Sequence, residues 1–188
     1  MKSTQAVVVI LIILIIDQWS KFYIKTHFAL HDSVAVFSWF KIYFIENEGM
    51  AWGAKIPGNY GKLILTVFRL LAIVGIGYWL YDVLRKQSSW VLTLSISLIF
   101  AGAMGNIIDS VFYGVFFEHS MGQVAEFLPQ GGGYGKWLHG KVVDMFSFSF
   151  FNPVFNVADT AISTGVGLLI LFNKKAFPKG QKQEQNKV

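Results

Sequence analysis

The stretch at residues 142–161, VVDMFSFSFFNPVFNVADTA, decides how this 188-residue chain is interpreted. It holds two carboxylates, Asp144 and Asp159, in a run that is otherwise apolar and aromatic. Asp159 opens a hydrophobic segment that ends at Phe172, and Asp144 precedes it across a Pro-containing bend at 151–153. An ionisable group at membrane depth is costly, so each acid marks a functional site by default. Two carboxylates close together would share one proton, which is the basis of aspartic-protease chemistry.

The composition places the chain among membrane proteins. It is 54% hydrophobic and 16% aromatic with a mean hydropathy of +0.49, which is too apolar for an ordinary soluble domain. The net charge is +5, and the positive excess collects at the C-terminus, which is typical of a cytoplasmic flank rather than a nucleic-acid site. The sequence has no cysteine, so thiol catalysis and disulfides are excluded. The histidines show no metal-ligand spacing, and we expect no metal or other cofactor.

Four apolar segments are long enough to be helices that cross about 30 Å of hydrocarbon, which needs roughly 20 residues each. They cover about residues 4–24, 63–84, 90–111 and 155–172. We therefore predict an all-α integral membrane protein with four transmembrane helices, and a single membrane domain over residues 1–188.

The charges that flank these segments predict the orientation. With both termini in the cytoplasm, the short basic loop at 85–86 and the Lys-rich tail lie inside, as the positive-inside rule requires. Segments of about 25–62 and 112–154 then lie in the periplasm. The first is β-branched and aromatic over 34–45, which predicts a small β-rich periplasmic module on the membrane. The last residues, about 179–188, are polar and are predicted to be disordered.

In this topology the polar residues of three helices share one depth, the outer boundary of the membrane. Asp17 lies in the outer half of the first helix, Asn106 and Asp109 end the third, and Asn156 and Asp159 begin the fourth. Each Asn–Asp pair is spaced i, i+3 and lies on one helix face. We expect the Asn beside each Asp to donate an amide hydrogen bond that fixes the rotamer of a carboxylate.

Other residues in the helices carry weaker signals. Gly102 and Gly105 form a small-x-x-small face that permits close helix packing. Asp17 and Lys21 are spaced i, i+4 and fit either an interfacial ion pair or a substrate contact. Arg69, inside the second helix, either snorkels outward or pairs with an acid.

Five motifs along the chain together resemble the lipoprotein signal peptidases, the type II signal peptidases of bacteria, which form an aspartic peptidase family. In chain order the motifs are D-Q-x-x-K at 17–21, N-x-G-x-A-W-G at 47–53, G-A-M-G-N-I-I-D at 102–109, V-V-D-M at 142–145 and F-N-x-A-D at 155–159. One such motif would be weak evidence, but five in the family's order span nearly the whole chain and are highly specific.

The resemblance implies a membrane aspartic endopeptidase that removes the signal peptide from diacylglyceryl-modified prolipoproteins. Cleavage falls just before the lipidated cysteine, at the periplasmic face of the bacterial inner membrane. The resemblance gives the catalytic role to Asp144 and Asp159. It gives substrate binding or dyad support to a further set: Asp17, Lys21, Asn47, Gly49, Asn106, Asp109 and Asn156.

The same resemblance implies inhibition by peptide antibiotics of the globomycin type. The expected partners are the lipidated prolipoprotein and membrane lipids, with no nucleic acid, and we expect a monomer.

The sequence departs from the family pattern at two places. Ser110 follows Asp109 where family members commonly carry Arg. The segment of about 114–140 is longer than the family's usual stretch, and long loops are often functional. We predict that it forms a lid or rim over the active site, or a substrate-selectivity element.

The competing hypothesis is a non-enzymatic four-helix membrane transporter that uses the same acids. Transporters often show inverted repeats and interrupted helices near the midplane. Here the acids gather at one face and the sequence shows no internal repeat, which disfavours transport. A third hypothesis, a structural assembly factor, would leave the two aspartates replaceable one at a time.

Overall fold

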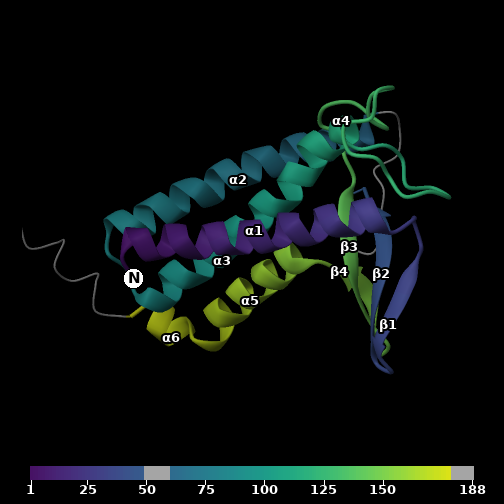
Figure 1. Ribbon diagram of the computed structural model, residues 1–188. Coiled ribbons are helices and arrows are strands. Elements are labelled where there is room, and N and C mark those ends of the chain that lie inside the picture. Colours follow the sequence, from purple (N-terminus) through teal and green to yellow (C-terminus); the bar gives the residue numbers. More distant parts are fainter. Residues whose placement is uncertain (49–59, 179–188) are drawn as a thin grey trace, which may run out of the picture.

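The computed structural model describes residues 1–48 and 60–178, and it has a helix bundle with a small sheet across one end (Figure 1). The helical elements are α1 Ser3–His27, α2 Gly61–Arg85, α3 Trp90–Ile108, the π-helical segment η2 Asp109–Tyr113, α4 Gly114–Phe116, α5 Val157–Leu171 and α6 Asn173–Ala176. The strands are β1 Ser33–Phe37, β2 Phe40–Asn47, β3 Val142–Phe148 and β4 Phe151–Phe155.

In the part of the chain that the structure describes, three helical segments are long and apolar enough to cross a membrane: Ser3–His27, Gly61–Arg85 and Trp90–Phe116. The protein is therefore a multi-pass membrane protein with several apolar helices. The fourth apolar helix, α5, has 15 residues, a length of about 22 Å at 1.5 Å per residue. It begins at Val157, two residues after the predicted start, because Asn156 caps it.

Helix α3 lies at the centre of the bundle. It packs against α1, α2 and α5, and 67% of its most apolar stretch is buried, compared with 17% in α1 and in α2. Glycines allow the close approach, since a Cβ atom at Gly102 would lie 2.2 Å from the carbonyl oxygen of Ala158 in α5. A Cβ atom at Gly105 would lie 2.5 Å from Asp17 Oδ2 in α1. The prediction of close helix packing at these glycines is confirmed.

The sheet has four antiparallel strands in the order β1-β2-β3-β4. Strands β1 and β2 lie in the segment for which the sequence predicts strands. The sequence did not predict the strand that carries Asp144, because only 34–45 was interpreted as β-structure, whereas Val142–Phe148 forms β3 and pairs with β2. The alternation of Phe146 and Phe148 with polar Ser147 is the strand signal in this run. The second outer segment thus supplies half of the sheet.

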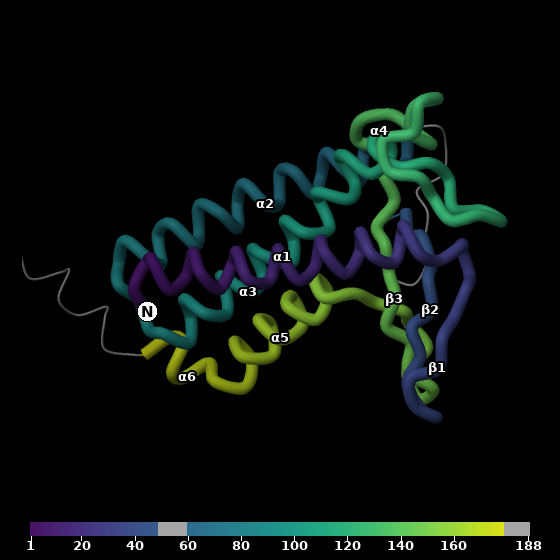
Figure 2. Tube along the Cα trace, in the orientation of Figure 1, coloured from purple at the N-terminus to yellow at the C-terminus, as the bar shows by residue number. Residues whose placement is uncertain are grey.

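The sheet stands beside the helix ends that carry the polar residues. Figures 1 and 2 show the C-terminal ends of α1 and α3 and the N-terminal ends of α2 and α5 at the sheet end of the bundle. The N-terminus and α6 lie at the opposite end. The polar residues of the different helices are therefore gathered at one end of the molecule. The predicted disordered tail at 179–188 lies outside the described residues.

Candidate active site

Asp144 is held in β3 by two amides. Its side chain is buried, with Oδ2 accepting from Asn47 Nδ2 at 3.1 Å and Oδ1 accepting from Asn156 Nδ2 at 2.7 Å. Asn47 ends β2, the strand that pairs with β3, so the sheet itself brings the first amide to the carboxylate. Both oxygens of Asp144 are therefore oriented by donors from other elements.

Asp159 is held in the first turn of α5 by a reciprocal cap. Asn156 precedes the helix, and its Oδ1 accepts from the backbone N–H of Asp159 at 2.9 Å. Asp159 Oδ2 accepts in return from the backbone N–H of Asn156 at 3.4 Å. This capping box satisfies two of the backbone donors that a helix start leaves open. It also fixes the direction in which the Asp159 side chain leaves the helix.

Two asparagines connect the carboxylates of different elements. Asn156 donates to Asp144, while Asn106 Nδ2 donates to Asp159 Oδ1 at 2.8 Å. The two amides also meet, with Asn156 Nδ2 lying 3.2 Å from Asn106 Oδ1. The prediction that these amides donate to carboxylates and fix them is confirmed, although neither acceptor is the Asp three residues away on the same helix face. Each amide donates instead to a carboxylate on another element, which ties Asp144 and Asp159 into one network.

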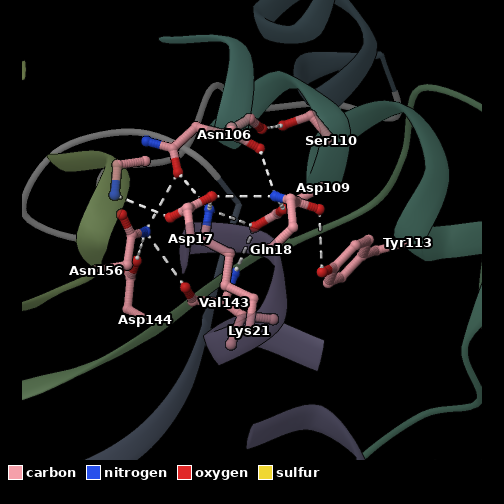
Figure 3. Close-up of polar contacts among 12 residues, drawn as sticks. Asp17, Gln18, Lys21, Asn106, Asp109, Ser110, Tyr113, Val143, Asp144 and Asn156 are labelled. Atoms are coloured by element: carbon pink, nitrogen blue, oxygen red, sulfur yellow. Dashed lines mark hydrogen bonds and ion pairs between the residues drawn. The ribbon is translucent and has the colours of Figure 1, made fainter. Parts of the chain in front are cut away.

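A buried ion triad supports this network from α1 and the end of α3 (Figure 3). Lys21 Nζ lies 3.0 Å from Asp17 Oδ2 and 2.9 Å from Asp109 Oδ2, and all three side chains are fully buried. Lys21 also donates to Asn106 Oδ1 at 2.9 Å. Buried charges need pairing of this kind, because desolvation penalises each ion separately. Asp17 and Lys21 therefore form a buried ion pair within the protein.

The two acids of the triad also hold the elements that carry the candidate dyad. Asp17 Oδ1 accepts from the backbone N–H of Ala158, next to Asp159, at 2.8 Å. Asp109 Oδ2 accepts from the backbone N–H of Val143, next to Asp144, at 3.2 Å. Each acid of the triad thus holds the backbone of the residue that precedes a candidate catalytic carboxylate.

Gln18 belongs to the site, although the sequence did not single it out. Its Nε2 lies 3.0 Å from Asp17 Oδ2 and 2.9 Å from Asp109 Oδ1, so one amide links both acids of the triad (Figure 3). It also lies 3.1 Å from the carbonyl oxygen of Gly105. Residues next to each other on a helix usually point in different directions, so the spacing of Gln18 from Asp17 did not suggest a contact between them. The presence of Gln18 in the motif at 17–21 was the only sign in the sequence that it belongs to the site.

Asp144 and Asp159 line the same cavity, which has a volume of about 580 Å³. Asn47, Asn106 and Arg69 also line it, and the hydroxyl-bearing face of α5 and the apolar β4 complete the wall. Burial raises the pKa of the Asp144 carboxyl to about 7, and the negative charge of Asp159 adds to the effect. A carboxyl with this pKa can hold a proton near neutral pH and give it up during a reaction.

Comparison with known proteins decides the family. The family model for signal peptidase (SPase) II matches residues 9–174. The chain belongs to the signal peptidase II family.

Curated relatives and solved structures agree with this assignment. The lipoprotein signal peptidase of Porphyromonas gingivalis (strain W83) is 41% identical over 205 residues, which cover 93% of this chain and 89% of the relative. That of Amoebophilus asiaticus is 31% identical, covering 80% of this chain and 69% of the relative. A bacterial membrane enzyme solved in meso at 2.3 Å resolution has a TM-score of 0.67 and 26% identity, with 97% of this chain and 93% of that chain covered. The fold is that of a membrane enzyme with several apolar helices and a small antiparallel sheet.

Nearly all the site residues expected from the sequence lie in this one network of the peptidase. Gly49 is the exception, because it lies outside the described residues. Among the residues that the structure describes, no group of three or more His, Cys, Asp and Glu side chains is arranged to hold a metal ion.

The long segment at 114–140 packs beside the C-terminal end of α1. Val124 bridges to Ala29, and the backbone carbonyl of Ser120 accepts from the N–H of Leu30 at 2.8 Å. No residue of 114–140 lines the cavity in the described part of the chain. The structure therefore does not place this segment as a lid or rim over the two carboxylates. Its role in substrate selectivity stays a prediction.

A second ion cluster, centred on the buried side chains of Lys25 and Glu46, attaches this segment to the sheet. Lys25 Nζ pairs with Glu46 and donates to Ser120 Oγ at 2.7 Å. Lys141 Nζ lies 3.0 Å from Glu46 Oε2. Burial by itself would raise the pKa of Glu46, but the two ammonium groups hold that pKa below its ordinary value. Glu46 precedes Asn47 in β2, so this cluster supports the strand that carries a donor to Asp144.

We expect Glu46→Gln to lower the melting temperature of the peptidase by roughly 10 °C. The change leaves the ammonium of Lys25 buried without its counter-ion, and breaking a buried pair costs about 3–5 kcal/mol. Asp82→Asn is the matched control, since the Lys86–Asp82 pair has side chains that are 62% and 35% exposed and is worth about 0–1 kcal/mol. Thermal melts of both variants in one detergent make the comparison. Equal melting temperatures would show that the buried cluster does not stabilise the fold.

Proposed function

We propose that this chain is a membrane aspartic endopeptidase that removes the signal peptide from diacylglyceryl-modified prolipoproteins, cleaving just before the lipidated cysteine. One observation carries the proposal. Asp144 and Asp159 come from different elements, line one cavity, and are bridged by the amides of Asn106 and Asn156. Two carboxylates in one cavity titrate as a unit, because both cannot ionise cheaply at close range.

The proposed reaction uses one proton shared by the pair. Asp144, whose pKa is raised to about 7, begins protonated and donates a hydrogen bond to the oxygen of the scissile carbonyl. Asp159 begins ionised and takes a proton from a water molecule, whose oxygen bonds to the carbonyl carbon. The proton of Asp144 passes to the carbonyl oxygen, which gives a neutral diol. Asp159 then protonates the leaving nitrogen, the C–N bond breaks, and Asp144 recovers a proton from the diol.

Asp17, Lys21 and Asp109 have a supporting part in this proposal. They are fully buried and lie behind the cavity, not in its wall. Their contacts to the backbone at Ala158 and Val143 keep the two carboxylates in place. Asn47, Asn106 and Asn156 orient the carboxylate oxygens directly. Preorganised donors of this kind need little rearrangement during the reaction.

We further propose that the cavity faces the periplasm and that both termini lie in the cytoplasm. The end of the bundle opposite the sheet carries a set of basic residues: Lys2, Arg85, Lys86, Lys174 and Lys175. The positive-inside rule assigns that end to the cytoplasm of the bacterial inner membrane. In this arrangement α5 is the fourth span, and its length of about 22 Å is accommodated by local thinning of the bilayer. The chain then forms a single membrane domain with its sheet at the periplasmic surface.

The relatives support the substrate class. They are named lipoprotein signal peptidases, and their similarity to this chain extends over most of its length. We propose that the monomeric peptidase meets its precursor within the lipid bilayer, and that peptide antibiotics of the globomycin type compete for the same cavity. The transporter hypothesis is not retained, because the family is a peptidase family.

Cleavage of matched precursors tests this function. The purified peptidase is incubated with one precursor that carries a diacylglyceryl group on its cysteine and with the same precursor unmodified. We expect a single cut before the modified cysteine and at least about a hundredfold slower cleavage of the unmodified form, since contacts to remote parts of a substrate contribute to rate. Mass spectrometry of the products identifies the bond. A cut at another bond, or equal rates for the two precursors, would contradict the proposed substrate.

A further inference from the structure

Arg69 is a charge in an apolar helix that the proposed reaction does not yet use. It is the one charged residue of α2 between Lys62 and Asp82 in the sequence. It is half-buried and lines the cavity that holds Asp144 and Asp159. Ionisable residues within membrane segments are costly and usually face a polar cavity or pathway. Arg69 is therefore directed toward the site and not toward lipid.

Ser110 is one partner of the Arg69 guanidinium. Arg69 Nη1 donates to Ser110 Oγ at 3.4 Å, and Ser110 Oγ donates in turn to the carbonyl oxygen of Asn106 at 2.9 Å. Ser110 is fully buried in the π-helical segment that follows α3. The guanidinium from α2 thus reaches the turn next to Asn106, whose amide donates to Asp159.

The chemistry of a guanidinium suits a peptide backbone in this cavity. It is planar, stays charged and presents five N–H donors, so it can hold Ser110 and a carbonyl oxygen at the same time. A peptide entering the cavity loses water around its carbonyl groups, and these acceptors then need donors from the protein. The positive charge also acts on the carboxylates of Asp159, Asp109 and Asp144.

We propose that Arg69 binds the substrate, donating hydrogen bonds to backbone carbonyl oxygens of the precursor and holding its scissile bond between Asp144 and Asp159. This inference rests on the proposed function, because it assigns the cavity to a peptide substrate. The alternative is that Arg69 acts only as a counter-ion for the carboxylates. The two roles differ in what Arg69 changes: substrate affinity in the first, the pH dependence of the rate in the second.

Binding without cleavage separates these roles. A fluorescent signal peptide with a diacylglyceryl cysteine is titrated into the Asp144→Asn variant, alone and combined with Arg69→Gln. We expect Arg69→Gln to raise the Kd about ten- to a hundredfold, the usual loss for a charge-assisted hydrogen bond. Arg85→Gln in the same background is the matched control, since Arg85 is exposed at the other end of α2, and it should leave the Kd unchanged. An unchanged Kd for Arg69→Gln, with or without a shifted pH–rate profile, would overturn the proposal.

A relocated arginine gives a second test that does not depend on how well Arg69→Gln folds. Because Arg69 reaches Ser110, an arginine at position 110 can present its guanidinium from the neighbouring element. We expect the double variant Arg69→Ala with Ser110→Arg to bind the peptide at least about tenfold more tightly than Arg69→Ala alone. If the double variant melts like the wild type but binds the peptide no more tightly than Arg69→Ala, the proposal is overturned. Cleavage by Asp144→Asn within about tenfold of the wild-type rate would instead contradict the proposed function, which keeps the two failures distinct.

Discussion

Replacing either Asp144 or Asp159 by Asn is expected to lower the cleavage rate about a thousandfold or more. The carboxylate pair supplies both the general base and the general acid, and an amide can do neither. Each single change should be sufficient, because the two residues act as one unit and their effects are not additive. Cleavage of a diacylglyceryl-modified precursor by the purified variants measures the loss.

The fold is expected to survive these changes with a modest drop in melting temperature. Both oxygens of Asp144 accept from amide nitrogens, and both oxygens of Asp159 accept from N–H groups. In each variant the new Asn has an NH₂ group where the Asp had its second oxygen. That NH₂ group faces an N–H donor and cannot accept from it, so each variant loses about one hydrogen bond. Asp32→Asn is the matched control, since Asp32 is exposed and accepts from the backbone of Ala29. A dyad variant that cleaves within about tenfold of the wild-type rate would show that the pair is not the catalytic unit.

Lys21→Met is expected to have the largest effect on stability. It leaves the carboxylates of Asp17 and Asp109 fully buried without their cation, which costs about 5 kcal/mol. That is comparable with the whole stability of many proteins, about 5–15 kcal/mol. Since the same acids hold the backbones next to Asp144 and Asp159, cleavage should fall as well. Thermal melting and a cleavage assay on the same preparation measure both effects.

Two further variants show whether charge is the cause. Lys86→Met removes an ammonium that is 62% exposed and should melt like the wild type. Adding Asp17→Asn and Asp109→Asn to Lys21→Met removes the uncompensated charges and should recover part of the melting temperature. A Lys21→Met protein that melts with the wild type would contradict a supporting role for the triad.

The sequence predicted the helices well, because hydropathy and segment length determine which parts of a chain can cross a membrane. The starts and ends were less predictable. Helix α5 begins after Asn156 because that side chain caps Asp159, and the cap is a local hydrogen bond that a hydropathy window does not detect. The expectation that the acids of several helices lie together is confirmed by the contacts that join Asp17, Asp109 and Asp159 to one network, and their depth in the membrane stays a prediction.

The pairing within the site could not be predicted from periodicity. Spacings of i, i+3 show only that Asn106 and Asp109 share a helix face, whereas Asn106 donates to Asp159 on α5. Such partners are decided by how the helices pack, and the close contacts at Gly102 and Gly105 decide that packing here. Gln18 was missed for the same reason, because both its acid partners are revealed only by the fold.

Strand β3 was missed because its sequence has two interpretations. Val142–Phe148 is apolar and aromatic, as expected for a segment near the membrane, and its alternation is visible only in the second half. A sheet register also depends on the partner strand, and β2 lies about a hundred residues earlier in the chain. The position of Asn47 beside Asp144 follows from that pairing and could not be predicted from either segment alone.

The pH dependence of kcat/KM tests the central claim, one proton shared by two carboxylates, most directly. The pKa of Asp144 is raised to about 7, so its proton is present below that pH and lost above it. We predict that kcat/KM is highest where Asp144 still holds its proton and falls above about pH 7, as Asp144 ionises. Melting curves across the same range confirm that the fold persists. A rate that holds level or rises through pH 9 would contradict the account.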